Sequence, residues 1–174
     1  GNDIPRDQRA HHQLSAEERM VGALREQLML RFIFSVPGMP CIYYGDEAGM
    51  EGCADPFCRR TYPWGHEDEN MLTRYKAMIA MRREHAVLRT GECAFIAPCG
   101  AVLGVIRTIQ NGRDAFGKKA DNALAVTLIN RSARDVVVYL MEEDVGGAKT
   151  LKTDSGETLT ARAGAFSIKL SGLR

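Results

Sequence analysis

The sequence predicts an α+β fold in two parts, a helix–strand–loop–helix segment followed by an antiparallel β-sandwich. Apolar residues recur at three- and four-residue steps within 15–88, which is the period of amphipathic helices. From about residue 90, short apolar or alternating runs are instead separated by turn sequences such as "NGRD" and "DSGE". This change of period places a predicted domain boundary at 89–90, and it divides the 174 residues into 1–89 and 90–174.

The first helix is predicted to begin after "SAEE" at 15–18. This is a capping-box pattern, in which the Ser15 side chain accepts from the Glu18 amide and Glu18 reaches back. "VPGMP" at 36–40 ends the helix, because proline breaks helices and restricts the residue before it. The expected apolar stripe consists of Met20, Leu24, Leu28 and Phe32, with Val21 and Ile33 beside them.

The run "CIYY" at 41–44 is short, apolar and bounded by turn signals. It predicts a strand buried on both faces, as in parallel sheets, with Tyr43 and Tyr44 in the core. Residues 45–65 show no regular period, and so long a loop is uncommon in a compact domain unless it has a function. Because one helix–strand–helix piece cannot bury its own faces, this half is predicted to be a slice of a repeated α/β architecture.

A second helix is predicted from about residue 67 to residue 84, with an apolar stripe on one side and basic residues facing out. The stripe consists of Met71, Leu72, Tyr75, Met78 and Ile79, and the outward residues are Arg74, Lys76, Arg82 and Arg83.

The net charge and the spacing of the cysteines limit the classes of partner and cofactor that we expect. The net charge is +1 from 23 basic and 22 acidic residues, and no apolar run approaches the about 18 residues of a membrane span. We therefore expect neither nucleic acid nor membrane as a partner. The five cysteines match no CxxC pair and the four histidines do not cluster with them, so no metal site and no cofactor are expected. Unpaired thiols indicate a reducing compartment, so we expect a cytoplasmic protein, with secretion left open.

The stretch "SVPGMPCIYYGDEAGMEGCADPFCRRTYPWG" at 35–65 resembles the last strand and following loop of the α-amylase superfamily barrel, glycoside hydrolase family 13. The resemblance is to the neopullulanase, cyclomaltodextrinase and pullulanase-like branch. "ENMLTRYKAMIAMRREHAVLRTGE" at 69–92 looks like the last barrel helix. The resemblance implies that 1–89 ends a (β/α)₈ barrel with 41–44 as its eighth strand, and that 90–174 is the C-terminal sandwich. It further implies a C-terminal fragment of a retaining α-glucan hydrolase that acts on maltodextrin, pullulan or cyclodextrin.

In the resembled family the catalytic acid and nucleophile lie on middle strands, which have no counterpart in this sequence. No catalytic residue is therefore assigned, and the fragment is expected to be inactive. "GNDIPR" at 1–6 mimics an "NHDxxR" motif through Asp3 and Arg6, but the histidine is absent. The preferred interpretation of 1–14 is an inserted surface loop.

Four residues of the loop are predicted to bind substrate, namely Asp46, Glu47, Arg59 and Arg60. Adjacent residues of an extended segment point to opposite sides, so Asp46 and Glu47 are not expected to form an acid–nucleophile pair. They position groups at the rim of the cleft or, in the favoured alternative, hold the loop backbone or an arginine. Arg59 and Arg60 donate to sugar hydroxyls or a rim carboxylate, or form a solvated pair.

Aromatic residues bear on two further alternatives. Trp64, with Tyr62 and Phe57, is either a sugar-stacking platform or, as preferred, a loop anchor on the final helix. The rival function is a non-catalytic carbohydrate-binding or interaction module. After residue 90 the aromatics lie mostly inside apolar runs, which favours a structural sandwich; they are Phe95, Phe116, Tyr139 and Phe166. Apolar faces left without neighbours in 15–44 predict that the fragment self-associates as a dimer.

Overall fold

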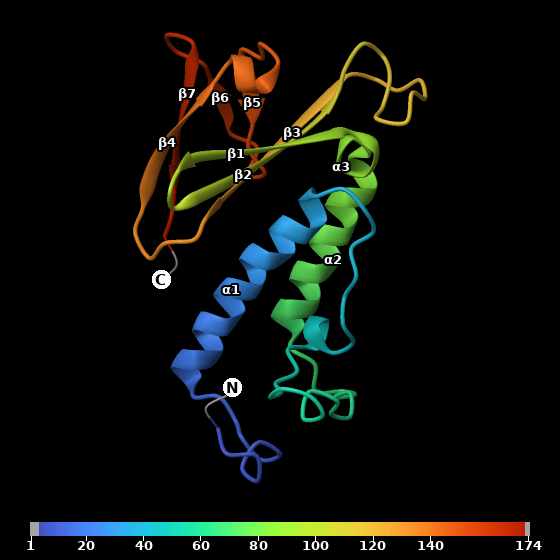
Figure 1. Ribbon diagram of the computed structural model, residues 1–174, viewed down its shortest axis with the longest axis vertical. Helices are drawn as coiled ribbons and strands as arrows, with labels where there is room; N and C mark the ends of the chain where they lie inside the picture. Colours follow the sequence, from blue (N-terminus) through green and yellow to red (C-terminus); the bar gives the residue numbers. More distant parts are fainter. Residues whose placement is uncertain (1–3, 173–174) are drawn as a thin grey trace.

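The computed structural model describes residues 4–172 and divides into a helical half and a β-rich half (Figure 1). No helix among these residues is long and apolar enough to cross a bilayer. The helical half contains α1 (Ala16–Ser35), the 3₁₀ turn η1 (Asp46–Ala48), α2 (Glu69–Glu84) and α3 (Ala86–Thr90).

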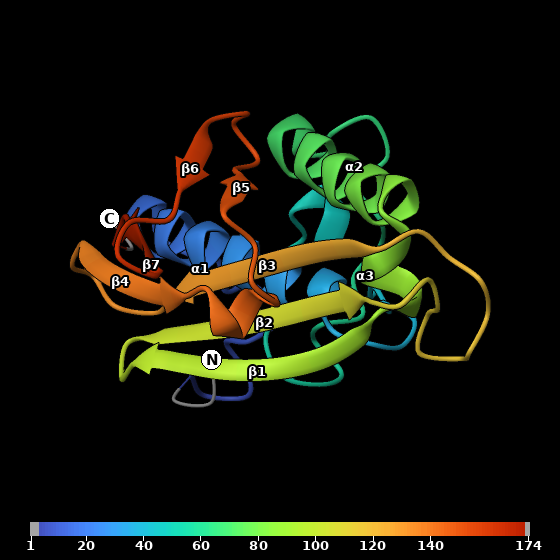
Figure 2. The same cartoon turned by 90° about the horizontal axis from the view of Figure 1, so that it is seen from above.

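The β-rich half is built from antiparallel pairs only, as the sequence predicts. Seen from above, the strands of the largest sheet lie side by side, with a two-stranded ribbon at one end and α3 at the other (Figure 2). A three-stranded sheet has the order β1 (Glu92–Cys99), β2 (Val102–Ile109), β3 (Ala123–Asn130). Two ribbons pair β4 (Val136–Met141) with β7 (Ala165–Leu170), and β5 (Thr150–Lys152) with β6 (Thr158–Thr160). The 3₁₀ turn η2 (Glu143–Val145) follows β4.

The main apolar core lies between the three-stranded sheet and the ribbons. Ile106 of β2 packs with Leu140 of β4, Val145 of η2 and Phe166 of β7. Leu140 and Phe166 are completely buried. Because successive strand residues point to opposite faces, the other face of the β4–β7 ribbon is left toward solvent.

The capping box predicted at the start of α1 is confirmed. The Glu18 amide donates to Ser15 Oγ at 3.2 Å, and the Ser15 amide donates to Glu18 Oε2 at 2.8 Å. Val36 caps the other end, in agreement with the stop predicted at 36–40.

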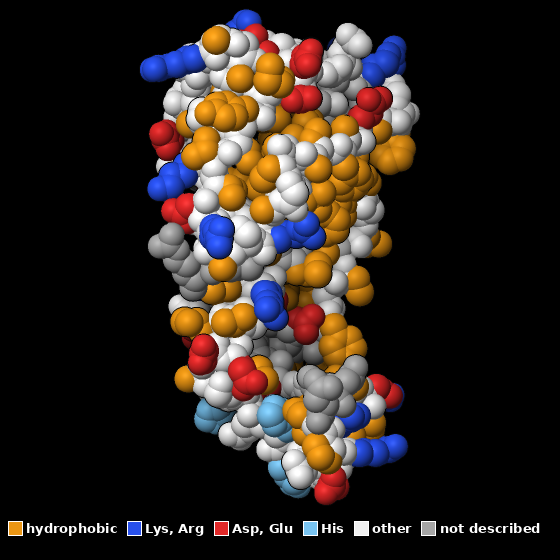
Figure 3. Space-filling model, turned by 60° about the vertical axis from the view of Figure 1, so that its left-hand side comes forward, with side chains coloured by type: hydrophobic (Ala, Val, Ile, Leu, Met, Phe, Trp, Pro, Cys, Tyr) orange, Lys and Arg blue, Asp and Glu red, His pale blue; other side chains and the backbone are white. Residues whose placement is uncertain are grey.

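The predicted apolar stripe of α1 is wrong in part. Met20 is 55% exposed, and the other stripe residues are only partly buried. The buried residues Leu30 and Phe34 lie instead at the C-terminal end, where they pack on Tyr75 of α2. The sheet and α2 converge at this end of α1, and for this reason its buried residues lie here, whereas the middle and the start of the helix make polar contacts such as Glu26 with Tyr75 and Arg19 with Glu51. The broad hydrophobic patch in Figure 3 lies in the upper part of the molecule, at the height of the β-rich half in Figure 1.

The strand predicted at 41–44 is not formed, and Tyr43 and Tyr44 are 49% and 45% exposed rather than in a core. A strand requires a hydrogen-bonded neighbour, and every strand in residues 4–172 lies after residue 91 and pairs elsewhere. Within this segment Ile42 packs partly on the Leu30–Phe34–Tyr75 cluster.

Arg82, predicted to face outward, is buried. It is 7% exposed, and its guanidinium donates to the carbonyl oxygens of Phe34 at 2.6 Å, Val36 at 3.1 Å and Gly38 at 2.6 Å. The last carbonyls of a helix lack intrahelical donors, and a guanidinium carries five N–H groups in a fixed fork. Arg82 therefore satisfies the end of α1. Burial lowers the pKa of its guanidinium, with the nearby Arg107 adding to the effect.

Arg107 on β2 joins the helical half to the sheet. It is 1% exposed and donates to the carbonyl oxygens of Ser35 at 2.7 Å, Leu88 at 2.8 Å and Gly91 at 2.7 Å, with a longer contact to Glu92 at 3.2 Å. All four acceptors are backbone carbonyls, and burial lowers the pKa of the guanidinium. One side chain thus holds the ends of α1 and α3 against the start of the sheet.

Candidate functional site

The loop after residue 44 turns sharply at two glycines. Gly45 and Gly49 have φ of +93° and +70° and flank η1. The φ of +93° is the reason that this turn favours glycine at position 45, and a Cβ there would also displace the Met50 side chain, whose Sδ would lie 2.2 Å away. Asp46 and Glu47 consequently lie in a 3₁₀ turn, and the expectation of an extended segment is wrong.

Glu47 holds the loop backbone, which is the structural alternative favoured from the sequence. Its Oε2 accepts a hydrogen bond from the Gly45 amide at 2.9 Å. Asp46 is exposed, yet partial desolvation raises the pKa of its carboxyl; a backbone hydrogen bond at Tyr43 opposes the rise and the charge of Glu47 adds to it. Glu47 therefore stabilises this turn through its side chain, whereas the Asp46 side chain is exposed beside it.

Arg59 and Arg60 contact other groups than Asp46 and Glu47. Arg59 forms a two-point ion pair with Asp55, with Nε to Oδ1 at 2.6 Å and Nη2 to Oδ2 at 2.7 Å. The hydrogen bond from Arg59 lowers the pKa of the Asp55 carboxyl. Both side chains are more than 60% exposed, at 63% and 62%. Sequence reasoning missed Asp55, although opposite charges four residues apart were a usable signal.

Arg60 instead ties the loop to the N-terminal segment. Its Nη2 donates to the carbonyl oxygens of Ala10 at 3.3 Å and His12 at 3.2 Å, while Tyr44 Oη donates to the Arg60 carbonyl at 2.9 Å. The predicted binding residues thus lie on one loop, with Arg59 presented to solvent and Arg60 engaged with the backbone.

The preferred assignment of Trp64 as an anchor packed on the final helix is wrong. Trp64 is 77% exposed, and its ring contacts Tyr62 with centroids 4.5 Å apart and planes inclined by 48°. The pair offers an aromatic surface on the same loop as Arg59.

A carboxyl group lies half-buried between α1 and α2. Tyr75 Oη donates to Glu26 Oε1 at 2.7 Å. Burial raises the pKa of the Glu26 carboxyl, and the charges of Asp46 and Asp68 add to the rise, whereas Tyr75 and Arg74 oppose it. Burial and the hydrogen bond to Glu26 also raise the pKa of the Tyr75 hydroxyl well above its usual range.

We expect Glu26→Gln to raise the unfolding temperature at pH 7. A carboxyl whose folded-state pKa is raised favours the folded state at low pH, and this contribution is lost as pH rises through the folded pKa. The substitution removes the charge and keeps an acceptor for Tyr75. The gain in thermal melts should therefore vanish near pH 4, close to the ordinary glutamate pKa of about 4.3. Exposed Glu17→Gln at the helix start should show no such gain. A pH-independent effect of Glu26→Gln would contradict the assignment.

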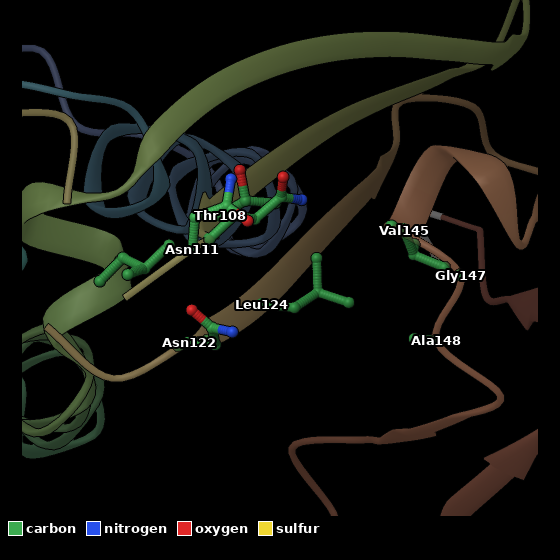
Figure 4. Close-up of a pocket in the computed structure, with 11 residues that line it drawn as sticks. Thr108, Asn111, Asn122, Leu124, Val145, Gly147 and Ala148 are labelled. Atoms are coloured by element: carbon green, nitrogen blue, oxygen red, sulfur yellow. The ribbon is translucent and has the colours of Figure 1, made fainter. Parts of the chain in front are cut away.

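A cavity of about 560 Å³ lies far from this loop, between the ends of β2 and β3 and the η2 turn (Figure 4). Amide side chains of Asn111 and Asn122 line one side, and backbone of Gly147 and Ala148 lines the other. None of its eleven lining residues is ionisable, so this cavity cannot carry acid–base catalysis.

The aromatics of the β-rich half contradict the expectation that they are mostly buried. Phe95, Phe116 and Tyr139 are 58%, 74% and 65% exposed, and only Phe166 is buried. All five cysteines are free.

Comparison with known proteins finds an amylopullulanase and a cyclomaltodextrinase among the relatives of this chain. The amylopullulanase of Thermoanaerobacter thermohydrosulfuricus is 38% identical over 138 residues, which cover 79% of this chain and 9% of that protein. The cyclomaltodextrinase of Geobacillus thermopakistaniensis is 32% identical over 146 residues, 83% of this chain and 23% of that protein. No family model matches the chain.

Two solved structures share the fold of this chain. A cyclomaltodextrinase structure shares 28% identity with a TM-score of 0.68, over 87% of this chain and 25% of its own. The α-amylase of Geobacillus thermoleovorans, complexed with acarbose, shares the fold at 21% identity and a TM-score of 0.72, over 90% of this chain and 32% of its own.

Sequence and fold therefore define the class as glycoside hydrolase. Within it, the chain has the sequence and fold of part of an α-amylase superfamily enzyme, and the predicted resemblance is confirmed. The fold is a small α+β domain of mostly antiparallel sheets, and it spans only 9% and 23% of the two curated relatives.

Proposed function

We propose that this chain forms the C-terminal part of a retaining α-glucan hydrolase that acts on maltodextrin, pullulan or cyclodextrin. The observation that carries the proposal is the 38% and 32% identity to an amylopullulanase and a cyclomaltodextrinase. In this proposal 1–89 completes the barrel and 90–174 is its sandwich. The half-exposed Tyr43 and Tyr44 support it, because 41–44 would become a strand once a neighbouring strand pairs with it. We place the enzyme in the cytoplasm, in keeping with its free thiols.

Retaining hydrolysis needs an acid and a nucleophile about 5–5.5 Å apart, which the proposal assigns to other strands of the barrel. The loop of this chain would wall the cleft. Asp46 and Glu47 shape its turn, and the Asp55–Arg59 pair fixes a guanidinium that donates to sugar hydroxyls. Arg60 supports the same wall through the backbone carbonyls of Ala10 and His12.

The test is a chimera in which residues 1–174, which include the Arg60 acceptors Ala10 and His12, replace the matching segment of the Geobacillus thermopakistaniensis cyclomaltodextrinase. The 174-residue chain alone should release no reducing sugar from cyclodextrin, pullulan or maltodextrin, whereas the chimera should hydrolyse at least one of them. A chimera that melts cooperatively but is inactive on all three glucans would overturn the proposal. Activity of the chain alone would overturn the assignment of the catalytic groups.

We expect Arg59→Ala in that chimera to lower kcat/KM by about 10- to 150-fold, the effect of losing a charge-assisted hydrogen bond of about 1.5–3 kcal/mol. Arg60→Ala should raise KM or lower kcat by loosening the wall. Arg113→Ala, an exposed arginine in the β-rich half, is the matched control and should leave kinetics unchanged. Unchanged kinetics for both loop variants would reduce these residues to solvated charges.

A further inference from the structure

We propose that a second cavity, beside β4 and β7, binds an α-glucan chain without cleaving it. The cavity has a volume of about 520 Å³. Its lining is a mixture of one aromatic ring, hydroxyls, a guanidinium and small apolar groups, from Tyr139, Leu159, Thr160, Arg162, Ala163, Ala165 and Ser167.

The register of the β4–β7 ribbon places the aromatic ring on the outer face. Tyr139 pairs directly with Ser167, while their neighbours Leu140 and Phe166 pair on the opposite face and are completely buried. Since side chains alternate along a strand, the Tyr139 ring stands on the solvent side, where it is 65% exposed. This is a large apolar surface that no core residue covers.

A tight turn fixes the far rim. The Arg162 amide donates to the Ala165 carbonyl at 2.8 Å and the Ala165 amide donates back at 3.1 Å, with Ala163 and Gly164 at φ of +49° and +81°. Both central residues are left-handed, as in a type I′ hairpin turn. The turn therefore holds Arg162 in place at the mouth of the cavity, although alanine rarely adopts this conformation.

The polar groups of the cavity are unused within the described chain. The side chains of Tyr139, Thr160, Arg162 and Ser167 make no hydrogen bond or ion pair with any group of residues 4–172. They supply three hydroxyls, which both donate and accept, and a planar fork of N–H donors. No carboxylate lines the cavity, so a bound sugar would meet no general acid or nucleophile.

This set of groups fits a neutral sugar chain. The face of a glucose ring presents C–H groups that pack on an aromatic ring, and its edge presents hydroxyls for the polar rim. A single arginine among uncharged groups favours a neutral ligand over a phosphate, which is usually held by several cationic or amide donors. That the chain is an α-glucan rests on the proposed function above.

The experiment uses titration calorimetry to measure the binding of maltoheptaose, cellohexaose and inorganic phosphate to the complete 174-residue chain. Maltoheptaose should bind, and Tyr139→Ala should weaken it by at least about ten-fold. Tyr139→Phe keeps the ring and should retain most of the affinity, and Arg162→Ala should reduce it. Phe116→Ala removes another exposed aromatic outside the cavity and should bind like the unaltered chain. Thermal melts verify that each variant is folded.

This site would be overturned if maltoheptaose did not bind, or if Tyr139→Ala and Arg162→Ala left its binding unchanged. Neither outcome would change the interpretation of the chimera experiment. Preference for cellohexaose or phosphate at the same Tyr139-dependent site would overturn the α-glucan assignment. An inactive chimera together with Tyr139-dependent maltoheptaose binding would remove the hydrolase proposal and leave the cavity as the function of the chain.

Discussion

Replacing Arg107 with methionine is expected to lower the free energy of unfolding by about 3–5 kcal/mol. The side chain is 1% exposed and is the donor for four carbonyl oxygens. Methionine fills a similar volume but donates nothing, so the buried carbonyls of Ser35, Leu88 and Gly91 lose this donor, at a cost of about 1–3 kcal/mol for each carbonyl left unpaired. Partial relaxation of the chain keeps the total below the sum.

Urea unfolding followed by circular dichroism measures this loss. Because the expected change is a large part of the about 5–15 kcal/mol that stabilises a domain, Arg107→Lys provides a milder second variant. Lysine keeps the charge but lacks the planar fork, so its loss should be smaller than that of methionine. Exposed Arg113→Met is the matched control. A loss below about 1 kcal/mol for Arg107→Met would show that these bonds contribute little net stability.

Amide exchange along α1 should be strongly graded, with amides 20–24 exchanging about a thousand-fold faster than amides 32–35. The first turns bury no residue, and Met20 is 55% exposed. The last turn is held by Leu30 and Phe34 and by the bonds from Arg82 and Arg107. Opening of the first turns therefore breaks few contacts, whereas exchange of the last turn requires the sheet junction to open.

The apolar stripe of α1 that begins at the exposed Met20 should make the isolated chain dimeric at tens of micromolar, since large apolar patches promote association. Light scattering on the unaltered chain and on Met20→Lys tests this, because a charge on the stripe should return the monomer. A monomeric unaltered chain would contradict the association. Uniform protection along α1, measured in the Met20→Lys variant, would contradict the gradient.

Structural features that depend on residues close together in the sequence could be predicted. The capping box of Ser15 and Glu18 uses groups three residues apart, and its pattern was sufficient to start α1 correctly. The apolar run at 41–44 was not sufficient to predict a strand, because an apolar run becomes a strand only where another strand pairs with it. Arg82 and Arg107 were missed for a similar reason. Their acceptors are carbonyls at helix ends, which no side-chain pattern reveals.

The candidate sites show the same division. The Asp55–Arg59 pair was accessible from its four-residue spacing, whereas the bond from the Gly45 amide to Glu47 depends on a turn that the sequence did not specify. Tyr139 lies within the apolar run "DVVVYLM", which reads as buried throughout. In the structure the run alternates, with Val138 and Leu140 inside and Val137 and Tyr139 outside. A continuous apolar run does not show which of its residues face the core.

Arg107 also limits how this chain can be taken apart. Its acceptors include Ser35 and Leu88 before the proposed boundary at 89–90 and Gly91 and Glu92 after it. A β-rich half excised at that boundary would contain the Arg107 guanidinium without two of its acceptors. The stability of such a fragment would therefore be lower than the stability of the same residues in the complete chain. Shuffling of the sandwich between enzymes therefore requires a breakpoint upstream of α1, so that the helix ends travel with the strand that secures them.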